Sequence, residues 1–383
     1  MVKTYGHLWE QISSFENLYL AFMAARNKKT EKPEVMRFQA SLEENLISMQ
    51  NELLWKTWEP KPWRIFQVYE PKKRTVHAPA FRDRVIHHAL VRVINPLFDR
   101  KMIDQSFACR TERGTHKAVA LAQRYAQEVE DRDGNFRFLK CDIHHYFPSI
   151  DHEILRRSIT RTIGDPDALW LVDRILDASG FPGVGLPIGA LTSQLFANVY
   201  LDKLDHFVKD ELGVKRYLRY MDDFLVFHKE KDALRWILAE ISDFVQAELR
   251  LSLNQKTRIC SGREAVNFCG YRIWPQHILP RKRNTRRVRK RLRRMAKLYA
   301  KGEMTMADIA PVIASHLGYL KHCRDVRGTE KFLRELVFKR PEMIKDVKRR
   351  KPHERLRRTA ASDTGTGTDA GKGHKGDRGA VHG

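Results

Sequence analysis

The chain has 383 residues, of which 42% are hydrophobic and 31% charged, a balance that excludes a disordered or fibrous protein and leaves room for about two or three domains. Its 71 lysine and arginine residues exceed its 47 aspartate and glutamate residues, and the net charge of +24 favours a polyanionic partner, of which nucleic acid is the commonest. Residues 1–15 lack the apolar core of a secretion signal, and no apolar run is long enough to cross a bilayer, so we expect a cytoplasmic protein with no membrane partner.

Helical spacing and strand alternation follow one another in the first third of the chain. Apolar residues recur at helical spacing over residues 6–58, and a proline-rich stretch then ends the helical pattern. Residues 65–79 alternate like two strands joined through residues 71–73, and helical spacing returns over residues 82–98. We therefore expect a helical N-terminal extension over residues 1–62, followed by a mixed region.

Acidic residues follow two strand-like segments in the middle of the chain. Residues 136–142 partly alternate between apolar and polar, which predicts a strand that ends on Asp142. Residues 215–228 are typical of two strands joined by a tight turn that carries Asp222 and Asp223. An Asp-Asp pair at such a turn often has only a local role, because aspartate side chains bond nearby backbone amides. If these strands share one sheet, however, Asp142 lies beside the turn.

Three clustered carboxylates would repel one another, and burial would increase the cost, unless a multivalent cation lay between them. Oxygen ligands favour Mg²⁺, and we expect two ions. Two such ions can lower the pKa of a primer hydroxyl, hold the attacked phosphate and stabilise the leaving pyrophosphate. The acids therefore predict nucleotidyl transfer.

The remaining segments alternate between helices, loops and short strands. Three further helices are expected, one from Asp151, one over residues 191–207 and one over residues 234–249. We expect a polar loop at residues 131–135 and a strand pair at residues 252–259 and 266–273. Cationic residues crowd a helical segment at residues 281–301, which favours a phosphate-contacting surface over a merely solvated helix face. Within it, Val288, Leu292, Met295 and Leu298 are spaced to form a buried apolar stripe. Residues 350–383 are rich in glycine and nearly free of apolar residues, which predicts a disordered tail.

The order of these motifs resembles that of reverse transcriptases. Residues 220–223 (YMDD) are similar to the Y-x-D-D motif of that family, and residues 140–147 (KCDIHHYF) are similar to its first catalytic strand. The resemblance runs from about residue 63 to about residue 273. It implies an α+β right-hand polymerase with a helical N-terminal extension (residues 1–62), fingers (63–135), a palm with the catalytic acids (136–275), a basic helical thumb (276–349) and a disordered C-terminal tail (350–383).

The resemblance implies a role for each acid. Asp142 and Asp222 would bind the two Mg²⁺ ions directly, with help from the backbone carbonyl of Ile143. Asp223 would support the site. Phe147 matches the bulky residue that the family places beneath the sugar, where a 2′-hydroxyl would collide, although an ordinary core phenylalanine is the alternative.

Residues 185–194 (GLPIGALTSQ) resemble the template and nucleotide loop of the family, with one departure. Many members carry Gln-Gly-x-x-x-Ser-Pro, whereas this chain has Ile188 before Gly189 and Gln194 after Ser193. Gly189 permits close backbone approach, and isoleucine in place of a hydrogen-bonding glutamine removes a polar check on the incoming nucleotide. We therefore expect an error-prone enzyme. This form of the loop resembles reverse transcriptases of diversity-generating retroelements, which copy an RNA template mutagenically, chiefly at adenines.

Less specific similarities extend the nucleotide site and the primer site. Arg74, Arg84 and Arg110 lie in segments similar to the fingers of the family, where a guanidinium suits bidentate contact with phosphate. For each arginine an ion pair is an equal alternative. Lys256 resembles the family's mobile lysine near the leaving phosphate. The residues that resemble the primer-gripping turn are Phe268, Gly270 and Tyr271.

The implied function is RNA-directed DNA synthesis that makes error-prone cDNA for mutagenic retrohoming. The partners implied are a structured template RNA, a DNA or RNA primer, deoxynucleoside triphosphates and a small basic accessory protein. Two alternatives stay open. The same chemistry can serve defence against phage, and a non-catalytic RNA-binding protein can retain a relic palm.

Overall fold

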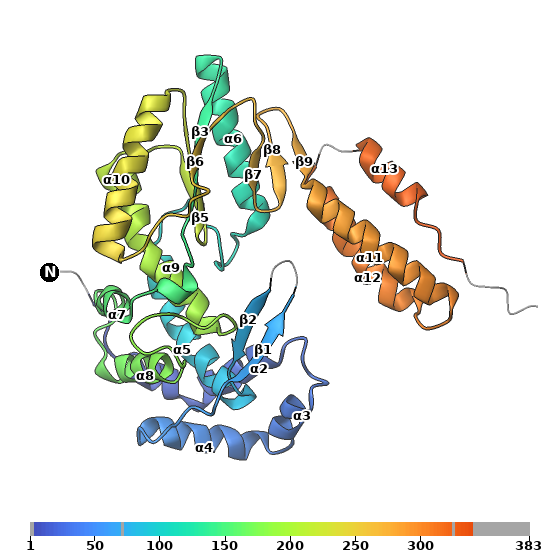
Figure 1. The fold of residues 1–383 in the computed structure, drawn as a ribbon. Coiled ribbons are helices and arrows are strands. Elements are labelled where there is room, and N and C mark those ends of the chain that lie inside the picture. The colour runs from blue at the N-terminus through green and yellow to red at the C-terminus, as the bar shows by residue number, and fades with distance from the viewer. Residues whose placement is uncertain (1–3, 70–72, 324–325, 340–383) are drawn as a thin grey trace, which may run out of the picture.

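The N-terminal part of the molecule is a layer of helices (Figure 1). The computed structural model describes residues 4–69, 73–323 and 326–339, so the predicted tail and most of the turn at residues 71–73 lie outside the described residues. The helices of this layer are α1 (Trp9–Ser13), α2 (Phe15–Arg26), α3 (Pro33–Ala40) and α4 (Leu42–Leu54). Of these, α1, α2 and α3 pack against the long helix α5 (Phe81–Asp99), and α4 packs on those three helices. The helices predicted before residue 58 and over residues 82–98 are therefore confirmed.

An antiparallel ribbon follows this layer in the chain. β1 (Arg64–Val68) pairs with β2 (Arg74–Ala78) in a register that places Arg64 opposite Ala78. β1 is exposed along its whole length, and Figure 1 shows the ribbon rising from the helical layer. The two strands predicted within residues 65–79 are therefore confirmed.

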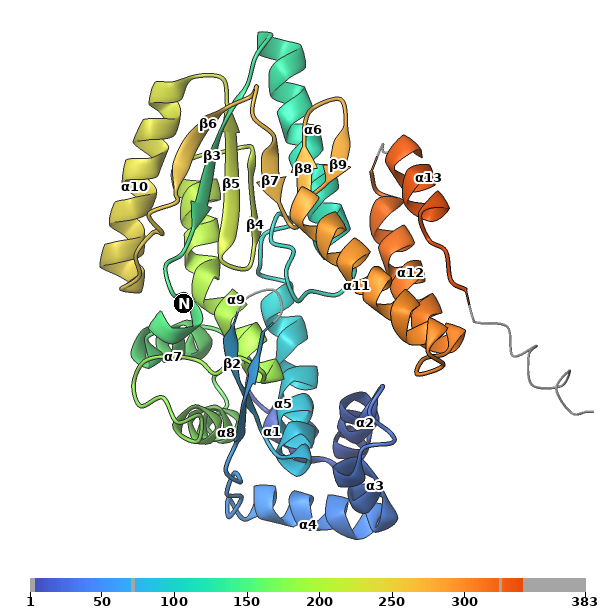
Figure 2. The same cartoon turned by 45° about the vertical axis from the view of Figure 1, so that its right-hand side comes forward.

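A four-stranded antiparallel sheet, which we call the central sheet, organises the next part of the molecule. Its strands in spatial order are β4 (Tyr217–Tyr220), β5 (Asp223–His228), β3 (Arg137–Asp142) and β6 (Arg258–Ser261). Helices α9 (Leu191–His206) and α10 (Lys231–Leu249) cover one face, and α6 (Thr115–Asp133) covers the other (Figure 2). Leu139 and Cys141 of β3 pack in the core that contains α9 and α10, whereas Phe138 packs in the core that contains α6, so β3 buries apolar side chains on both faces of the sheet.

The segment between β3 and α9 is mostly helical. It contains the 3₁₀ turn η1 (Phe147–Ser149), α7 (His152–Thr160) and α8 (Pro166–Asp177), and a π-helical turn η2 (Phe207–Glu211) follows α9. Asp151 begins α7 as predicted, because its Oδ1 accepts from the backbone N–H groups of Glu153 and Ile154 at 2.9 and 3.1 Å. The apolar helix predicted from residue 191 and the helix predicted from residue 234 are both present.

Two predictions from strand and loop patterns are wrong. Residues 131–133 belong to the last turn of α6, which Gly134 ends with a φ of 69°. Residues 252–259 and 266–273 do not pair with each other: β6 pairs with β3, while β7 (Val266–Phe268) and β8 (Tyr271–Ile273) form a hairpin that β9 (Ile278–Pro280) extends. The reason is a sharp turn at Cys269 and Gly270, whose φ angles are 45° and 87°.

The C-terminal helices form a separate small core. They are α11 (Lys282–Ala300), α12 (Met306–Leu320) and α13 (Val326–Arg334), and they project from β9 away from the central sheet (Figures 1 and 2). Leu292 and Met295 of α11 are buried with Ile309 of α12, so the apolar stripe expected within the cationic segment is confirmed. None of the helices in the described ranges combines the length and apolarity needed to cross a bilayer.

Candidate active site

The acids predicted from the sequence come together at one end of the central sheet. β3 and β5 pair in a register that places Asp142 directly opposite Asp223. β4 and β5 are joined by a two-residue turn, Met221 and Asp222, which we call the acid turn. The backbone N–H of Ile143 donates to the carbonyl oxygen of Asp222 at 3.2 Å. Asp142 and the acid turn, which are distant in the sequence, therefore lie next to each other in the sheet, as the predicted metal site requires.

These carboxylates are partly buried and perturb one another. Burial, followed by the charge of Asp142, raises the pKa of Asp222, while the nearby Arg74 acts in the opposite direction. Burial also raises the pKa of Asp223 to about 6, against the opposing effect of Lys140. The charged forms of both acids are thus disfavoured mainly because burial removes them from water, with a smaller contribution from the neighbouring carboxylates.

The donor atoms at this end of the sheet are of the kind that binds a divalent ion. Carboxylate and carbonyl oxygens are the hard ligands that Mg²⁺ prefers. The Oδ1 atom of Asp223 is buried and has no hydrogen-bond partner among the described residues, which is unfavourable unless a cation approaches it. However, no three His, Cys, Asp or Glu side chains in the described part of the chain are spaced to hold an ion. The two predicted Mg²⁺ ions therefore stay a proposal.

A lysine links the acids to the neighbouring hairpin. The Nζ atom of Lys140 lies 3.2 Å from Oδ2 of Asp223 and donates to the carbonyl oxygen of Asn267 on β7 at 2.6 Å. Both contacts fix the position of β7 relative to the central sheet. Lys140 therefore contacts both Asp223 and the β7–β8 hairpin.

The residues predicted to contact the primer lie on that hairpin. Phe268 is buried and meets Tyr220 edge to face, with ring centroids 6.5 Å apart. Gly270 has the positive φ that glycine tolerates, and its carbonyl oxygen accepts from the hydroxyl of Tyr319 at 2.5 Å. Tyr271 is buried, and its hydroxyl donates to the carbonyl oxygen of Tyr319 at 3.2 Å. The hairpin is thus held between the end of β4 and α12.

The predicted nucleotide loop packs between β2 and the segment that follows the first acid. The N–H of Leu186 donates to the carbonyl oxygen of Phe147 at 2.7 Å, and the N–H of His77 on β2 donates to that of Ile188 at 2.8 Å. Gly189 has a φ of 133°, and an added Cβ would lie 2.6 Å from the carbonyl oxygen of His77. Only glycine therefore fits at position 189, and the neighbour that comes so close is the backbone of β2.

Three other predicted positions lie around this loop. Phe147 is partly buried against the core that contains α9 and α10, and it packs beside Tyr146 with ring centroids 5.6 Å apart. Gln194 is exposed in the first turn of α9. Lys256 is exposed in the loop before β6, where Asn254 donates its backbone N–H to the carbonyl oxygen of Asp142 at 2.7 Å. This loop is therefore attached to the end of β3.

The three predicted arginines differ in their surroundings. Arg74 is exposed at the start of β2 and lies near enough to Asp222 to lower its pKa. Arg84 instead forms an ion pair with Glu34 at 2.6 Å. The side chain of Arg110 is 4% exposed and is held by Asp99, with Nε to Oδ1 at 2.5 Å. For Arg84 and Arg110 the structure thus favours the ion pair, the alternative that the sequence had left open.

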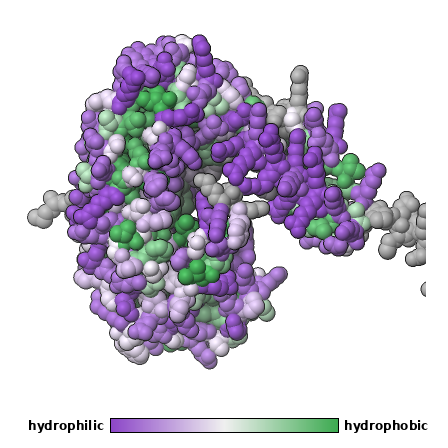
Figure 3. Space-filling model, in the orientation of Figure 1, coloured by the Kyte–Doolittle hydropathy of each residue, from purple (hydrophilic) through white to green (hydrophobic). Residues whose placement is uncertain are grey.

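Positive charge collects on α11. Its 19 residues include ten Lys or Arg and no Asp or Glu. Most of these cations are exposed, and the surface over α11 at the right of Figure 3 is mostly hydrophilic. Arg287 and Arg291 line a pocket of about 590 Å³ that α11 shares with α12. The distribution matches the phosphate-contacting surface predicted for residues 281–301.

Comparison with known proteins assigns the family. Residues 61–273, more than half of the chain, match the family described as reverse transcriptase (RNA-dependent DNA polymerase). The chain belongs to the reverse transcriptase family. The right-hand polymerase architecture predicted from the motifs is thereby confirmed, and the chain carries an RNA-directed DNA polymerase domain. The matched range includes the three acids, the nucleotide loop and the β7–β8 hairpin.

The relatives are distant. Protein YkfC of Escherichia coli (strain K12) is 25% identical over 280 residues, which cover 61% of this chain and 72% of YkfC. The group II intron-encoded protein LtrA of Lactococcus lactis subsp. cremoris is 24% identical over 304 residues, covering 60% of this chain and 50% of LtrA. The apo telomerase structure from Candida tropicalis has a TM-score of 0.46 at 12% identity, with 72% of this chain and 61% of that chain covered, a likeness too low to carry an argument.

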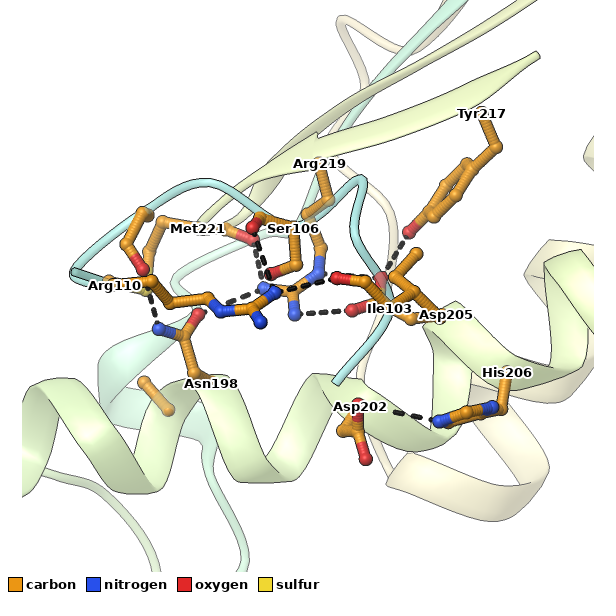
Figure 4. Close-up of polar contacts among 12 residues, drawn as sticks. Ile103, Ser106, Arg110, Asn198, Asp202, Asp205, His206, Tyr217, Arg219 and Met221 are labelled. Atoms are coloured by element: carbon orange, nitrogen blue, oxygen red, sulfur yellow. Dashed lines mark hydrogen bonds and ion pairs between the residues drawn. The ribbon is translucent and has the colours of Figure 1, made fainter. Parts of the chain in front are cut away.

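Sequence analysis of this reverse transcriptase missed two cations beside the acids. Lys140 lies two residues before Asp142 on a strand, so alternation alone would have placed both on one face. Arg219 is fully buried and reaches Asp205 of α9 as well as the carbonyl oxygen of Met221 (Figure 4). No local pattern indicated that burial, because arginine is usually exposed.

Proposed function

We propose that the chain is an RNA-directed DNA polymerase that extends a primer along an RNA template. The observation that carries this proposal is the strand register that sets Asp142 opposite Asp223 and beside the acid turn, within a chain that matches the reverse transcriptase family. The reaction joins the primer 3′-hydroxyl oxygen to the α-phosphate of a deoxynucleoside triphosphate and releases pyrophosphate.

In this proposal Asp142 and Asp222 hold two Mg²⁺ ions together with the backbone carbonyl of Ile143. When bound, such ions lower the pKa of the primer hydroxyl and stabilise the charge on the leaving pyrophosphate. Asp223 supports the site through Lys140, which keeps its carboxylate oriented toward the end of β3. The rigid strand pairing holds these groups in place before substrate binds, which reduces the reorganisation needed for reaction.

The nucleotide would lie between the acids and the β1–β2 ribbon. Arg74 of the ribbon lies near enough to Asp222 for the two charges to interact, and it would contact the triphosphate, with Lys256 approaching from the loop before β6. Phe147 would lie beneath the sugar. The loop at Ile188 and Gly189, with Gln194 exposed beside it on α9, would contact the nucleotide and template. Arg84 and Arg110 would stabilise the fold rather than bind the nucleotide, since both form ion pairs.

The finer proposal is error-prone copying in a diversity-generating retroelement, with a small basic accessory protein as partner. It is supported by Ile188, an apolar side chain where many family members place a glutamine that can hydrogen-bond. The similarity to the group II intron-encoded protein LtrA favours a second candidate, in which the chain copies or binds an intron RNA. Defence against phage would use the same chemistry on another template.

Substitution of the acid turn tests the polymerase. Asp222→Asn keeps the shape of the side chain but removes its charge, so we expect DNA synthesis on a primed RNA template with Mg²⁺ to fall by about 10²- to 10³-fold or more. We expect the thermal unfolding temperature to stay the same or rise, because burial and Asp142 already disfavour the charged form.

Asp243→Asn, on the exposed side of α10, is the matched control and should synthesise DNA at the wild-type rate. No synthesis by the wild-type chain on any primed template, or equal synthesis by Asp222→Asn, would favour the non-catalytic RNA-binding protein. Sequencing the cDNA then separates the finer candidates. Errors concentrated at template adenines support the retroelement, whereas equal error at all four bases counts against it.

A further inference from the structure

We propose that Arg219 is a positioning residue that fixes the acid turn for divalent-ion binding. The inference rests on the proposed function, because it assigns Asp222 to the ion. Arg219 contacts no reacting atom, and its guanidinium acts through the carbonyl oxygen of Met221, to which Nη1 donates at 3.0 Å. The same turn carries Asp222, which lies close enough to Asp142 for their charges to interact.

The guanidinium is anchored on its other side by α9. Its Nε and Nη2 atoms donate to the two carboxylate oxygens of Asp205 at 2.7 and 2.5 Å, and Nη1 also donates to Oδ1 of Asn198 at 3.2 Å (Figure 4). Arg219 and Asp205 are both fully buried. A planar guanidinium with paired partners has a fixed orientation. Because Arg219 is fixed by Asp205, its hydrogen bond to Met221 connects the acid turn to α9.

The acid turn needs such an attachment for two reasons. Met221 has a φ of 57°, a left-handed conformation that is strained for a residue other than glycine and persists only where its surroundings hold it. In addition, Asp142 and Asp222 carry like charges, and their repulsion tends to push the turn away from β3. A hydrogen bond from a buried cation to the Met221 carbonyl opposes both tendencies.

The backbone of Arg219 extends the attachment to the segment between α5 and α6. Its N–H donates to the carbonyl oxygen of Gln105 at 2.9 Å, and its carbonyl oxygen accepts from the N–H of Phe107 at 3.0 Å. Asn198 continues the connection, since its Nδ2 donates to the carbonyl oxygen of Ala108 at 2.7 Å. One buried residue therefore joins the acid turn to α9, which begins directly after the nucleotide loop, and to this neighbouring segment.

A merely structural role makes a different prediction. If Arg219 only stabilised the fold, its loss would reduce the fraction of folded protein but would leave the ion affinity of the folded fraction unchanged. If it positions Asp222, its loss weakens ion binding in molecules that are still folded. Ion affinity is thus the quantity that separates the two roles.

The test uses Arg219→Lys in the full chain. Lysine keeps the buried charge near Asp205 but lacks the planar fork that reaches Asp205 and Met221 together. We expect the half-saturating concentration of Mn²⁺, followed by electron paramagnetic resonance as a stand-in for Mg²⁺, to rise about tenfold or more. The half-saturating Mg²⁺ for DNA synthesis should rise by the same factor, while the KM for the nucleotide changes less.

Tyr217→Phe is the matched control. The Tyr217 hydroxyl donates to the same Oδ1 of Asp205 at 2.7 Å, but it does not touch the acid turn. We expect a lower unfolding temperature with unchanged Mn²⁺ affinity. If Arg219→Lys does not fold, Asn198→Ala replaces it: the Asp205 pair is kept and only one of the two partners of Nη1 is lost. Mn²⁺ affinity should then fall about threefold, which is less than the roughly 10- to 100-fold loss typical when a metal ligand loses its supporting contact.

The outcomes separate this inference from the proposed function. If the wild-type chain makes DNA but Mn²⁺ affinity is the same in wild type, Arg219→Lys and Asn198→Ala, the positioning role is wrong and the polymerase stands. If the wild-type chain makes no DNA but Mn²⁺ binding weakens in Arg219→Lys and not in Tyr217→Phe, the positioning role stands and the polymerase is wrong. Equal weakening in Arg219→Lys and Tyr217→Phe overturns the inference, since general loosening then explains it.

Discussion

The central sheet and helix α11 place their charges in opposite ways. In the sheet, Arg219 is fully buried and each of its three guanidinium nitrogens donates to a named acceptor. On α11 the cations are mostly exposed, and no acid on the same helix neutralises them. Buried charges are costly unless they are paired, whereas exposed cations contribute little to stability and are available to a polyanion. The contrast indicates that the buried charges of the central sheet stabilise the position of the acid turn, whereas the exposed charges of α11 are available to bind a ligand.

Asp205→Ala is expected to give the largest effect on stability. It leaves the Arg219 guanidinium buried without its carboxylate, a change that typically costs about 3–5 kcal/mol of unfolding free energy. Denaturant unfolding followed by circular dichroism measures this cost. A loss of less than about 1 kcal/mol would mean that water reaches Arg219, and the contrast with α11 would fail.

A triple substitution provides the control for that experiment. Asp205→Leu, Tyr217→Phe and Arg219→Met together replace the buried charges and the hydroxyl between them with apolar side chains of similar volume. Such exchanges are often close to neutral, so we expect the triple variant to recover most of the lost unfolding free energy. Recovery would show that the loss in Asp205→Ala comes from the unpaired charge rather than from the packing of α9.

Asp202 is expected to give an intermediate effect that depends on pH. Burial, followed by the neighbouring Asp205, raises its pKa to about 6, against the opposing effect of His206. Its buried Oδ1 has no hydrogen-bond partner among the described residues and lies 3.7 Å from Nε2 of His206, beyond hydrogen-bond distance. Because the folded chain binds this proton more tightly than the unfolded chain, stability from this group is lost as pH rises from about 4 to about 6. Above pH 6 the charged form lowers the unfolding free energy by about 1–2 kcal/mol, discounted for partial exposure.

Asp202→Asn removes that penalty. We expect the variant to match the wild type near pH 4 and to exceed it by about 1–2 kcal/mol near pH 7.5. Unfolding in denaturant at both pH values measures the difference. Asp243→Asn changes an exposed carboxylate and should show no pH-dependent difference. A gain for Asp202→Asn that is equal at both pH values would mean that Asp202 keeps its ordinary pKa.

The same contrast explains what could be predicted from the sequence. The hairpin at residues 215–228 was predictable because strand alternation and turn chemistry act between near neighbours. We expected this hairpin to lie beside Asp142 if the strands shared one sheet. They do share one, and β3 and β5 pair with Asp142 opposite Asp223. The cationic helix was predictable because its charge and its apolar stripe are both local.

The parts that were missed depend on contacts between distant elements. Arg219 and Asp205 lie on a strand and a helix that the chain brings together only on folding, so neither residue shows a local signal of burial. The pairing of residues 252–273 was wrong because apolar alternation continues through Cys269, whose φ of 45° marks a turn that β-propensity does not detect. The resemblance to the primer-gripping turn located that bend correctly, since it depends on the residue order around Gly270.

Charge removal on α11 should affect stability least and nucleic-acid binding most. Lys290→Gln, Arg293→Gln and Lys297→Gln alter exposed residues on one side of the helix. We expect the unfolding free energy to change by less than about 0.5 kcal/mol. The plot of log affinity for a primed RNA template against log salt should lose about 0.7–0.9 of its slope for each phosphate contact removed, or about 2–3 in total.

The matched control removes the same charge from the other side of the molecule in Figure 1. Arg157→Gln on α7, Arg161→Gln directly after α7 and Lys231→Gln at the start of α10 should leave the salt slope within about 0.5 of the wild-type value. An equal loss of slope in both triple variants would mean that net charge, rather than its arrangement on α11, attracts the nucleic acid. A loss confined to α11 would mean that the nucleic acid contacts that helix, and the β7–β8 hairpin would then link the bound duplex to the acids, because Lys140 contacts β7 and the turn of the hairpin contacts α12.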